Sequence, residues 1–178
     1  NCAHKNSALL AGMKNAKNDY IVFLDSDAVP RKNWLCDLIG PLKNKEIGAT
    51  TGYRFYMPNK GFLSYVLCAW NNIGLLQMFG RYAFMWGGSS AISRQMLQRL
   101  KIQKLMEKTF SDDTQITQAV KKAGLKIKFV PSCIINSEMS EFSRLSEFTM
   151  RQMIAVRLYF KNVWMAGAVF YLGNLLTI

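Results

Sequence analysis

This sequence has few of the residues on which nucleophilic and zinc chemistry depend. His4 is the single histidine among 178 residues, which argues against a Ser-His-Asp or Cys-His mechanism. The four cysteines form no Cys-x-x-Cys pair, so neither a zinc site nor a disulfide framework is indicated, and we expect reduced, mostly buried thiols: Cys2, Cys36, Cys68 and Cys133. A Gly-x-x-x-x-Gly-Lys-Ser/Thr loop is also missing, which excludes a P-loop nucleotidase.

Acidic residues are scarce as well. The chain carries 11 acidic against 23 basic residues, a net charge of +12. Such an excess points to an anionic partner: nucleic acid, an anionic membrane surface or a phosphorylated substrate. Only 4 residues are proline and half of the sequence is hydrophobic. The chain is therefore neither disordered nor fibrous, and it is long enough for one domain with a real core.

Two long stretches contain no charged residue. Residues 62–79 reach the length of a spanning helix, but their Asn, Gln, Ser and Gly residues favour a buried or membrane-surface helix over a span. Residues 162–178 form the second stretch, and Arg151, Arg157 and Lys161 precede it, as expected of a cytoplasmic flank. We therefore expect a fragment of a membrane-anchored protein, with the start of a transmembrane helix at 162–178.

The order of helical and strand patterns predicts an α/β sandwich. The continuous apolar run at 20–24 is typical of a buried strand in a parallel sheet, and further strands are expected at 47–57 and 125–130. Helices are expected over 3–17, around Trp34 to Ile39 with an end at Gly40-Pro41, and from Ser111 to Gly124.

The most informative feature is Asp25-Ser26-Asp27, directly after the first strand. Ligands of open α/β sheets lie just outside the carboxyl ends of the strands. Two carboxylates at such a position suit a hard divalent cation that in turn holds a phosphate. The alternative is a simple turn, because Asp and Ser are also common where a strand ends.

Two further motifs carry chemistry in the same order along the chain. Trp86-Gly87-Gly88-Ser89 follows an aromatic run, and paired glycines there indicate close backbone approach or a tight turn. Asp112 and Asp113 follow Ser111 at the start of a predicted helix, where carboxylates also act as ordinary helix caps.

The ordered set of motifs resembles the processive and lipid-directed inverting glycosyltransferases of family 2, and in particular the ceramide glucosyltransferase-like branch. The resemblance covers essentially the whole chain: Lys5, Asp25-Ser26-Asp27, Trp86-Gly87-Gly88-Ser89, Ser111-Asp112-Asp113, then Arg151-Gln152 and Arg157. It implies a nucleotide-sugar-binding, glycosyltransferase A-type (Rossmann-like) sandwich, truncated at its N-terminus, with a C-terminal membrane segment. The catalytic domain would span 1–140 and an interfacial helix would span 141–161. A transmembrane helix would start at 162.

The resemblance also implies roles for the acidic residues. Asp25 and Asp27 would hold a divalent cation, Mg or Mn, that bridges the donor diphosphate, and Asp113 would be the general base. Asp112 would line the sugar and acceptor cleft together with Trp86, Gly87, Gly88 and Ser89; Tyr53 and Arg54 are weaker candidates for that cleft.

Basic residues would complete the donor site. Lys5 corresponds to a lysine near the nucleotide, with a solvated helix lysine as the alternative. Arg151, Gln152 and Arg157 stand where the family has Gln/Arg-x-x-Arg-Trp, but Ile154 lies three residues before Arg157 and Leu158 replaces the tryptophan. These residues would contact phosphate, or the basic ones would simply flank a membrane helix.

The expected function is therefore an inverting, metal-dependent transfer of a sugar from a nucleotide-sugar donor, of the UDP-glucose type, to a membrane lipid or glycan. The full protein would be a multi-pass membrane protein with its catalytic domain facing the cytoplasm. One alternative is an inactive membrane scaffold of the same fold. Another is a basic nucleic-acid-binding module, which the scattered basic residues and the absence of a recognisable nucleic-acid motif disfavour, so no nucleic acid is expected as a partner.

Overall fold

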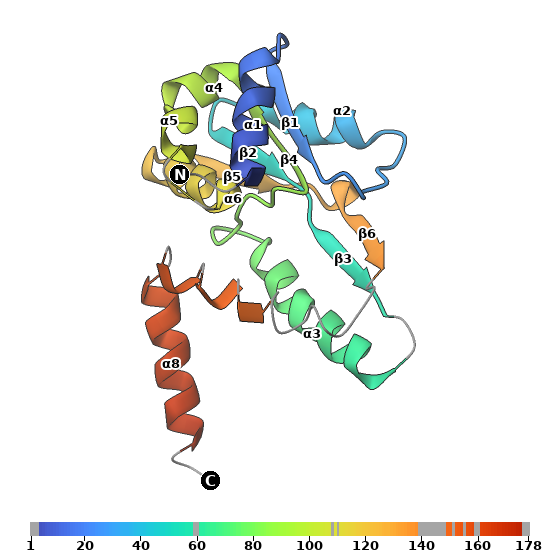
Figure 1. Ribbon diagram of the computed structural model, residues 1–178, viewed down its shortest axis with the longest axis vertical. Helices are drawn as coiled ribbons and strands as arrows, with labels where there is room; N and C mark the ends of the chain where they lie inside the picture. The colour runs from blue at the N-terminus through green and yellow to red at the C-terminus, as the bar shows by residue number, and fades with distance from the viewer. Residues whose placement is uncertain are drawn as a thin grey trace. The chain divides into compact units, whose positions relative to one another are not determined.

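The computed structural model describes residues 4–58, 61–107, 109, 111–138, 149–150, 152–154, 156–158 and 161–175. The chain divides into two compact units, Asn1–Met139 and Ser140–Ile178, which are described separately (Figure 1). The elements of the first unit are α1 (His4–Asn15), β1 (Tyr20–Leu24), α2 (Trp34–Ile39), η1 (Gly40–Lys43), β2 (Ile47–Thr51), β3 (Arg54–Met57), α3 (Phe62–Gln77), β4 (Ser89–Ser93), α4 (Arg94–Arg99), α5 (Ile102–Met106), α6 (Asp112–Lys122), β5 (Lys126–Phe129), η2 (Pro131–Cys133) and β6 (Ile135–Glu138).

A four-stranded mixed sheet forms the centre of the first unit, in the order β1-β4-β2-β5. Strand β4 is antiparallel to both of its neighbours, with Leu24 opposite Ser89 and Thr51 opposite Ser90, while β2 and β5 are parallel. The expectation that 20–24 belongs to a parallel arrangement was wrong for its described partner. A short apolar run encodes burial, but it does not encode the direction of the neighbouring strand.

The two faces of the sheet have separate cores, because successive side chains of a strand point to opposite sides. Ile21 and Phe23 pack on one face and Val22 on the other; Ile92 and Ala91 repeat this division on β4. The helices α1, α4, α5 and α6 cover the first face and α2 covers the second (Figure 1). The predicted α/β sandwich is confirmed for this unit.

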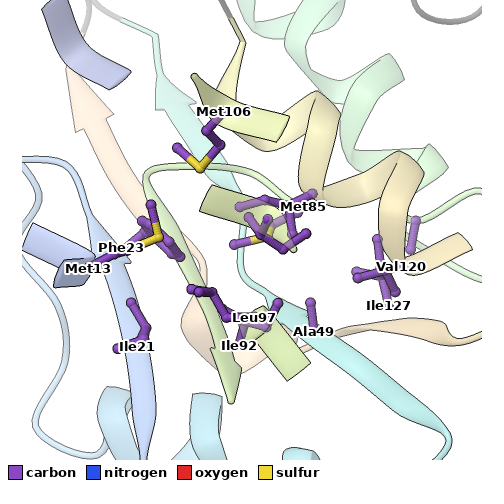
Figure 2. Packing of buried hydrophobic residues seen from close by; sticks show 13 residues of the cluster. Met13, Ile21, Phe23, Ala49, Met85, Ile92, Leu97, Met106, Val120 and Ile127 are labelled. Carbon is purple, nitrogen blue, oxygen red and sulfur yellow. The ribbon is translucent and has the colours of Figure 1, made fainter. Parts of the chain in front are cut away.

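The larger core lies under α1, α4, α5 and α6 (Figure 2). Full burial of such an apolar side chain stabilises the fold by roughly 1.5–3 kcal/mol. The labelled members are Met13, Ile21, Phe23, Ala49, Met85, Ile92, Leu97, Met106, Val120 and Ile127.

The chain leaves the main sheet at Gly52. The predicted single strand 47–57 is two strands, since β3 pairs in parallel with β6 in a separate two-stranded sheet. A Cβ at Gly52 would lie closer than 3.0 Å to the carbonyl of Cys133 and to Ser89 Oγ. The close approach of these backbones therefore requires glycine, and it redirects the chain so that Arg54 starts a new strand.

Helix α3 packs against β3 through one face and exposes apolar side chains on the other. Leu67 and Asn71 are buried, whereas Phe62 is 80% and Leu76 is 71% exposed. The expected helix in 62–79 is confirmed.

In the second unit, α8 runs from Lys161 to Leu175, and the described residues between 149 and 158 are helical. Most of the rest of the predicted interfacial helix, 141–148 included, lies outside the described residues. Within the part of the chain that the structure describes, no helix has both the length and the apolar character needed to cross a bilayer.

Candidate active site

The site is built where β1 ends beside the start of β4. The N–H of Asp25 donates to the carbonyl of Gly88 (3.2 Å), and the carbonyl of Asp25 accepts from the N–H of Ala28 (3.1 Å). The chain therefore turns immediately after the last paired residue of β1. The Asp25 side chain is 25% exposed and that of Asp27 is 70% exposed, so a ligand from solvent can reach both carboxylates.

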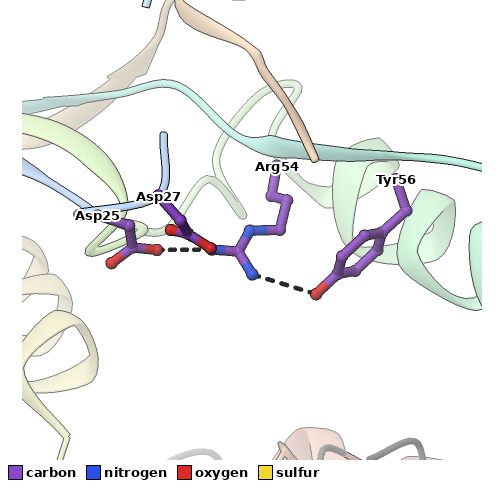
Figure 3. A network of polar contacts seen from close by, with 4 residues as sticks. All are labelled: Asp25, Asp27, Arg54 and Tyr56. Atoms are coloured by element: carbon purple, nitrogen blue, oxygen red, sulfur yellow. Dashed lines mark hydrogen bonds and ion pairs between the residues drawn. The ribbon is translucent and has the colours of Figure 1, made fainter. Parts of the chain in front are cut away.

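An arginine bridges the two carboxylates. Arg54 Nη2 lies 2.7 Å from Asp25 Oδ2 and 3.9 Å from Asp27 Oδ1 (Figure 3). From the sequence, Arg54 was only a weak cleft candidate, and this pairing was not predicted. The available signal was that Arg54 is the one charged residue in 47–59, and a lone charge in such a run needs a partner when it is partly buried.

Aromatic rings and a hydrogen bond hold the guanidinium in place. Its central carbon lies 5.7 Å from the centre of the Tyr56 ring and 5.3 Å from that of Trp86, and Nη1 donates to Tyr56 Oη (3.3 Å). Burial by itself lowers the pKa of Arg54, but the hydrogen bond to Tyr56 and the negative charges of Asp25 and Asp27 outweigh it and raise the pKa. Arg54 is therefore a permanent cation.

Helix α3 fixes the strand that carries Arg54. Asn71 Nδ2 donates to the carbonyl of Arg54 (2.7 Å), and Tyr53 Oη donates to the carbonyl of Asn71 (3.2 Å). Burial raises the pKa of Tyr53 to about 12, so this hydroxyl keeps its proton. A Cβ at Gly74 would lie closer than 3.0 Å to that hydroxyl. Glycine at 74 is thus what lets α3 approach β3 closely.

The second glycine of the 86–89 loop, Gly88, has a steric reason. A Cβ at Gly88 would lie closer than 3.0 Å to the Trp86 ring and to Asp25 Oδ2. Close approach is therefore the explanation here, and it brings the Trp86 ring and the Asp25 carboxylate together. Trp86 also contacts Tyr53 edge to face, with ring centres 6.1 Å apart.

Gly87 and Ser89 lie in the interior. Ser89 is fully buried; its Oγ accepts from Trp34 Nε1 (2.9 Å) and donates to the carbonyl of Cys133 (3.0 Å). The hydroxyl thus ties α2 and η2 to the sheet. In this structure it lies within the protein interior, away from the surface of a cleft.

The carboxylate of Asp113 is held at one oxygen. Its Oδ1 accepts from Ser111 Oγ (2.7 Å) and from the N–H of Thr114 (2.7 Å), while no hydrogen bond among the described residues reaches Oδ2. Ser111 is the N-cap residue of α6 but forms no side-chain cap bond. Asp112 is buried beside it. The carboxylate is therefore held in place through Oδ1, and Oδ2 can accept a hydrogen bond from another group.

Hydrogen bonds at the two ends of the 85–88 segment connect that segment with Asp113 and with Asp25. Thr117 Oγ1 donates to the carbonyl of Asp113 (2.7 Å) and accepts from the N–H of Met85 (2.9 Å). Three residues later the carbonyl of Gly88 accepts from Asp25. The 85–88 segment thus joins the start of α6 to the carboxyl end of β1.

The predicted basic residues of the donor site stay predictions. Lys5 lies in α1, but its side chain is outside the described part. Arg151 lies outside the described residues altogether. Gln152 and Arg157 are exposed residues of the second unit.

The carboxylate oxygens of Asp25 and Asp27 suit a divalent cation that also binds a phosphate. Among the described residues, no group of three or more His, Cys, Asp or Glu side chains is gathered to hold a metal. A magnesium-type ion, however, usually takes only one or two carboxylates and completes its shell with waters and substrate phosphates. The two carboxylates fit such an ion, provided that Arg54 shares or releases them.

Solved structures with a similar fold are glycosyltransferases. A mannosyltransferase from Pyrobaculum calidifontis, solved with GDP-Man and Mn²⁺, superimposes with a TM-score of 0.61 at 18% identity, over 90% of this chain and 43% of that one. Glucosyl-3-phosphoglycerate synthase from Mycobacterium tuberculosis, solved with Mn²⁺ and UDP-Glc, gives 0.53 at 20% identity, over 86% of this chain and 53% of that one.

Mannosyl-3-phosphoglycerate synthase from Rubrobacter xylanophilus gives a TM-score of 0.55 at 13% identity, over 88% of this chain and 51% of that one. At these identities the likeness shows the fold, which is the mixed α/β glycosyltransferase A-type architecture. The chain spans about half the length of the structures it matches. No curated protein matches the sequence.

The sequence itself carries a family signature. The model of the family described as "Glycosyl transferase family 2" matches residues 3–101, more than half of the 178 residues. The matched segment includes the Asp25–Asp27 turn, Arg54 and the 86–89 loop, which are the parts that meet at the end of β1. The chain therefore belongs to glycosyl transferase family 2.

Proposed function

We propose that the full-length protein is an inverting, metal-dependent glycosyltransferase that moves a sugar from a nucleotide-sugar donor, of the UDP-glucose type, to a membrane lipid or glycan. The observation that carries the proposal is the meeting of Asp25, Asp27 and Arg54 at the end of β1, linked through the 85–88 segment to Asp113. Similar folds solved with a sugar nucleotide and Mn²⁺ support it.

The end of β1 is the donor end of the site. Asp25 and Asp27 would hold Mg²⁺ or Mn²⁺, which supplies positive charge to the diphosphate as that group leaves. Arg54 lies beside them as a second fixed cation. Lys5, Arg151, Gln152 and Arg157 are proposed as further donor contacts, because ammonium and guanidinium groups pair well with phosphate and the amide of Gln152 can donate hydrogen bonds to it.

The start of α6 is the acceptor end of the site. Asp113 accepts the proton of the acceptor hydroxyl through its open oxygen, Oδ2. The hydroxyl oxygen bonds to the anomeric carbon on the face opposite the diphosphate, and the bond from that carbon to the diphosphate oxygen breaks. One displacement of this kind inverts the configuration of the sugar. Asp112, Trp86, Gly87 and Gly88 are proposed to shape the sugar and acceptor cleft, and the buried Ser89 to support their loop from the interior.

A membrane acceptor, as in the ceramide glucosyltransferase-like branch, is supported by the surface of α3 and by charge. The helix is uncharged over Phe62–Gln77 and exposes Phe62, Tyr65, Ile73 and Leu76. Exposed aromatic and aliphatic side chains of this kind suit the interfacial region of a bilayer. The net charge of +12 suits an anionic leaflet. We place the catalytic unit on the cytoplasmic side of a multi-pass protein that includes the 162–178 segment.

The test of this function is an Asp113→Asn variant of the full-length protein. Loss of the base should lower sugar transfer by roughly 10²–10⁴-fold while binding of the UDP-sugar changes little. Asp37→Asn is the matched control, because Asp37 also lies in the first turn of a helix. Transfer and donor binding are measured separately, by product formation and by calorimetric titration. Normal transfer by Asp113→Asn would show that Asp113 only caps α6.

A further inference from the structure

Arg54 lies where the proposed metal site needs a positive charge. The same two carboxylates that would hold the divalent cation are paired with one guanidinium nitrogen, at 2.7 Å from Asp25 and 3.9 Å from Asp27 (Figure 3). A permanent cation and a divalent cation on the same carboxylates repel each other, and the repulsion is stronger in a partly desolvated site. Arg54 therefore opposes metal binding for as long as it stays in this position.

The guanidinium is well held but not fully satisfied. Tyr56 and Trp86 lie against it, and Asn71 fixes its backbone. Its Nε, however, is buried and has no hydrogen-bond partner among the described residues. A buried donor without a partner is unfavourable, so a shift of the guanidinium that lets Nε–H pair with an incoming oxyanion would be favoured.

A diphosphate is such an oxyanion. Phosphate oxygens pair with two guanidinium N–H groups at once, and Nε–H with one Nη–H forms the required fork. Pairing of this kind would draw Arg54 away from both carboxylates and remove its positive charge from the place where the cation would bind. The diphosphate would then contact Arg54 and the cation together.

We propose that Arg54 is a built-in counter-cation of the Asp25–Asp27 pair, and that it makes divalent-cation binding depend on the donor diphosphate. This inference rests on the proposed function. In the donor-free protein the single positive charge of Arg54 offsets part of the negative charge of the two carboxylates and keeps cation affinity low. Because coupling between two ligands is reciprocal, the cation must raise nucleotide affinity by the same factor. Arg54 is thus a positioning residue that favours loading of donor and cation as one unit.

The experiment measures Mn²⁺ binding to the full-length protein, with and without UDP, from the free Mn²⁺ signal in electron paramagnetic resonance. It compares wild type with Arg54→Gln and Arg54→Lys. Arg81→Gln is the matched control: Arg81 also donates to a tyrosine hydroxyl (Tyr82 Oη, 2.8 Å) and stacks on that ring at 4.9 Å. The control removes the same charge and the same kind of aromatic contact. Circular dichroism and melting temperature check that each variant folds.

Arg54→Gln should tighten Mn²⁺ binding in the absence of UDP by about tenfold. In wild type, UDP should improve Mn²⁺ binding by a factor within the roughly 5–150-fold range of typical couplings. In Arg54→Gln this factor should be smaller. Arg54→Lys keeps the charge but loses the fork. It should bind Mn²⁺ as weakly as wild type without UDP, and it should show a smaller UDP effect. Arg81→Gln should resemble wild type in both measurements.

Two results would overturn the inference. Unchanged or weaker donor-free Mn²⁺ binding by folded Arg54→Gln would mean that Arg54 merely orients Asp25. An equal gain in Arg81→Gln would mean that general charge, and not this contact, controls the affinity. Absence of Mn²⁺ and UDP binding in wild type would instead contradict the proposed function itself, so the two failures are distinguishable.

Discussion

Two ion pairs of equal length lie at opposite ends of strand β2, and they differ in solvent exposure and in the segments that they connect. Lys126 Nζ lies 2.7 Å from Glu46 Oε2 just before the strand, and the two side chains are 73% and 67% exposed. Arg54 and Asp25, beyond the other end, are also 2.7 Å apart but only 24% and 25% exposed. Exposed pairs are screened by water and salt, whereas partly buried pairs are screened much less. Burial and neighbours, more than length, indicate which pair has a function.

The two pairs also connect different things. Lys126 lies on β5 next to β2, and its N–H donates to the carbonyl of Glu46 (2.9 Å), so the exposed pair adds little to a contact the backbone already makes. Arg54 connects β3 to the turn after β1, two segments that no described strand pairing joins directly. The partly buried pair is therefore part of what places the site residues, and variants at the two ends of β2 should differ sharply.

The largest difference is expected for ligand binding. Asp25→Ala removes a proposed cation ligand. Loss of a residue that only hydrogen-bonds to a metal ligand can weaken metal binding by roughly 100-fold, so loss of the ligand itself should weaken Mn²⁺-dependent UDP-sugar binding by more than that. Glu46→Ala is the matched control and should bind as wild type does. Calorimetric titration of both full-length variants, with and without Mn²⁺, measures this. Equal affinities for the two variants would remove the distinction drawn between the two pairs.

An intermediate effect is expected from the glycine that lets Trp86 and Asp25 meet. Gly88→Ala forces the indole or the carboxylate to move, so it should lower the free energy of unfolding by about 1–3 kcal/mol and weaken Mn²⁺ binding. Gly12→Ala is the control, since among the described residues no atom beyond the neighbouring helix backbone lies within 4 Å of a Cβ there. It should stabilise helix α1 by up to about 1 kcal/mol. Denaturant unfolding and Mn²⁺ titration of both variants test this, and a Gly88→Ala protein of unchanged stability and affinity would contradict it.

The smallest effect is expected at the exposed pair. The hydrogen bond and charge of Lys126 lower the pKa of Glu46 from its usual 4.5. A carboxyl group whose pKa is lower in the folded than in the unfolded state stabilises the fold at pH values above its unfolded pKa. This contribution is lost as the pH falls through the pKa of the folded state. The melting temperatures of wild type and Lys126→Met should therefore differ slightly at neutral pH and low salt, and converge at acidic pH or high salt. A salt-independent difference would mean that the pair is less exposed to solvent than its surface area indicates.

The parts of the fold that could be predicted are those in which neighbouring residues decide the structure. The strand Tyr20–Leu24 has both of its predicted ends, because five apolar residues stand between polar ones. The helix after Ser111 and its end near Gly124 also follow from local signals; Gly124 has a φ of +72° that favours glycine. By contrast, β4 consists of Ser89–Ser93, small and mostly polar residues that give no strand pattern but are almost all buried.

The site residues also separate into those that local sequence signals indicate and those that only the fold brings together. Asp25-Ser26-Asp27, the glycine pair and Asp112-Asp113 could be singled out from the sequence, because turns, close approaches and helix starts have characteristic residues. The pairing of Arg54 with Asp25 could not be found in that way. It depends on Gly52 turning the chain out of one sheet and on Asn71 and Trp86 arriving from other elements. Local order along the chain determined which residues are available for chemistry, whereas only long-range packing, which brings residues 29 positions apart to within a hydrogen bond, decided which charge faces which.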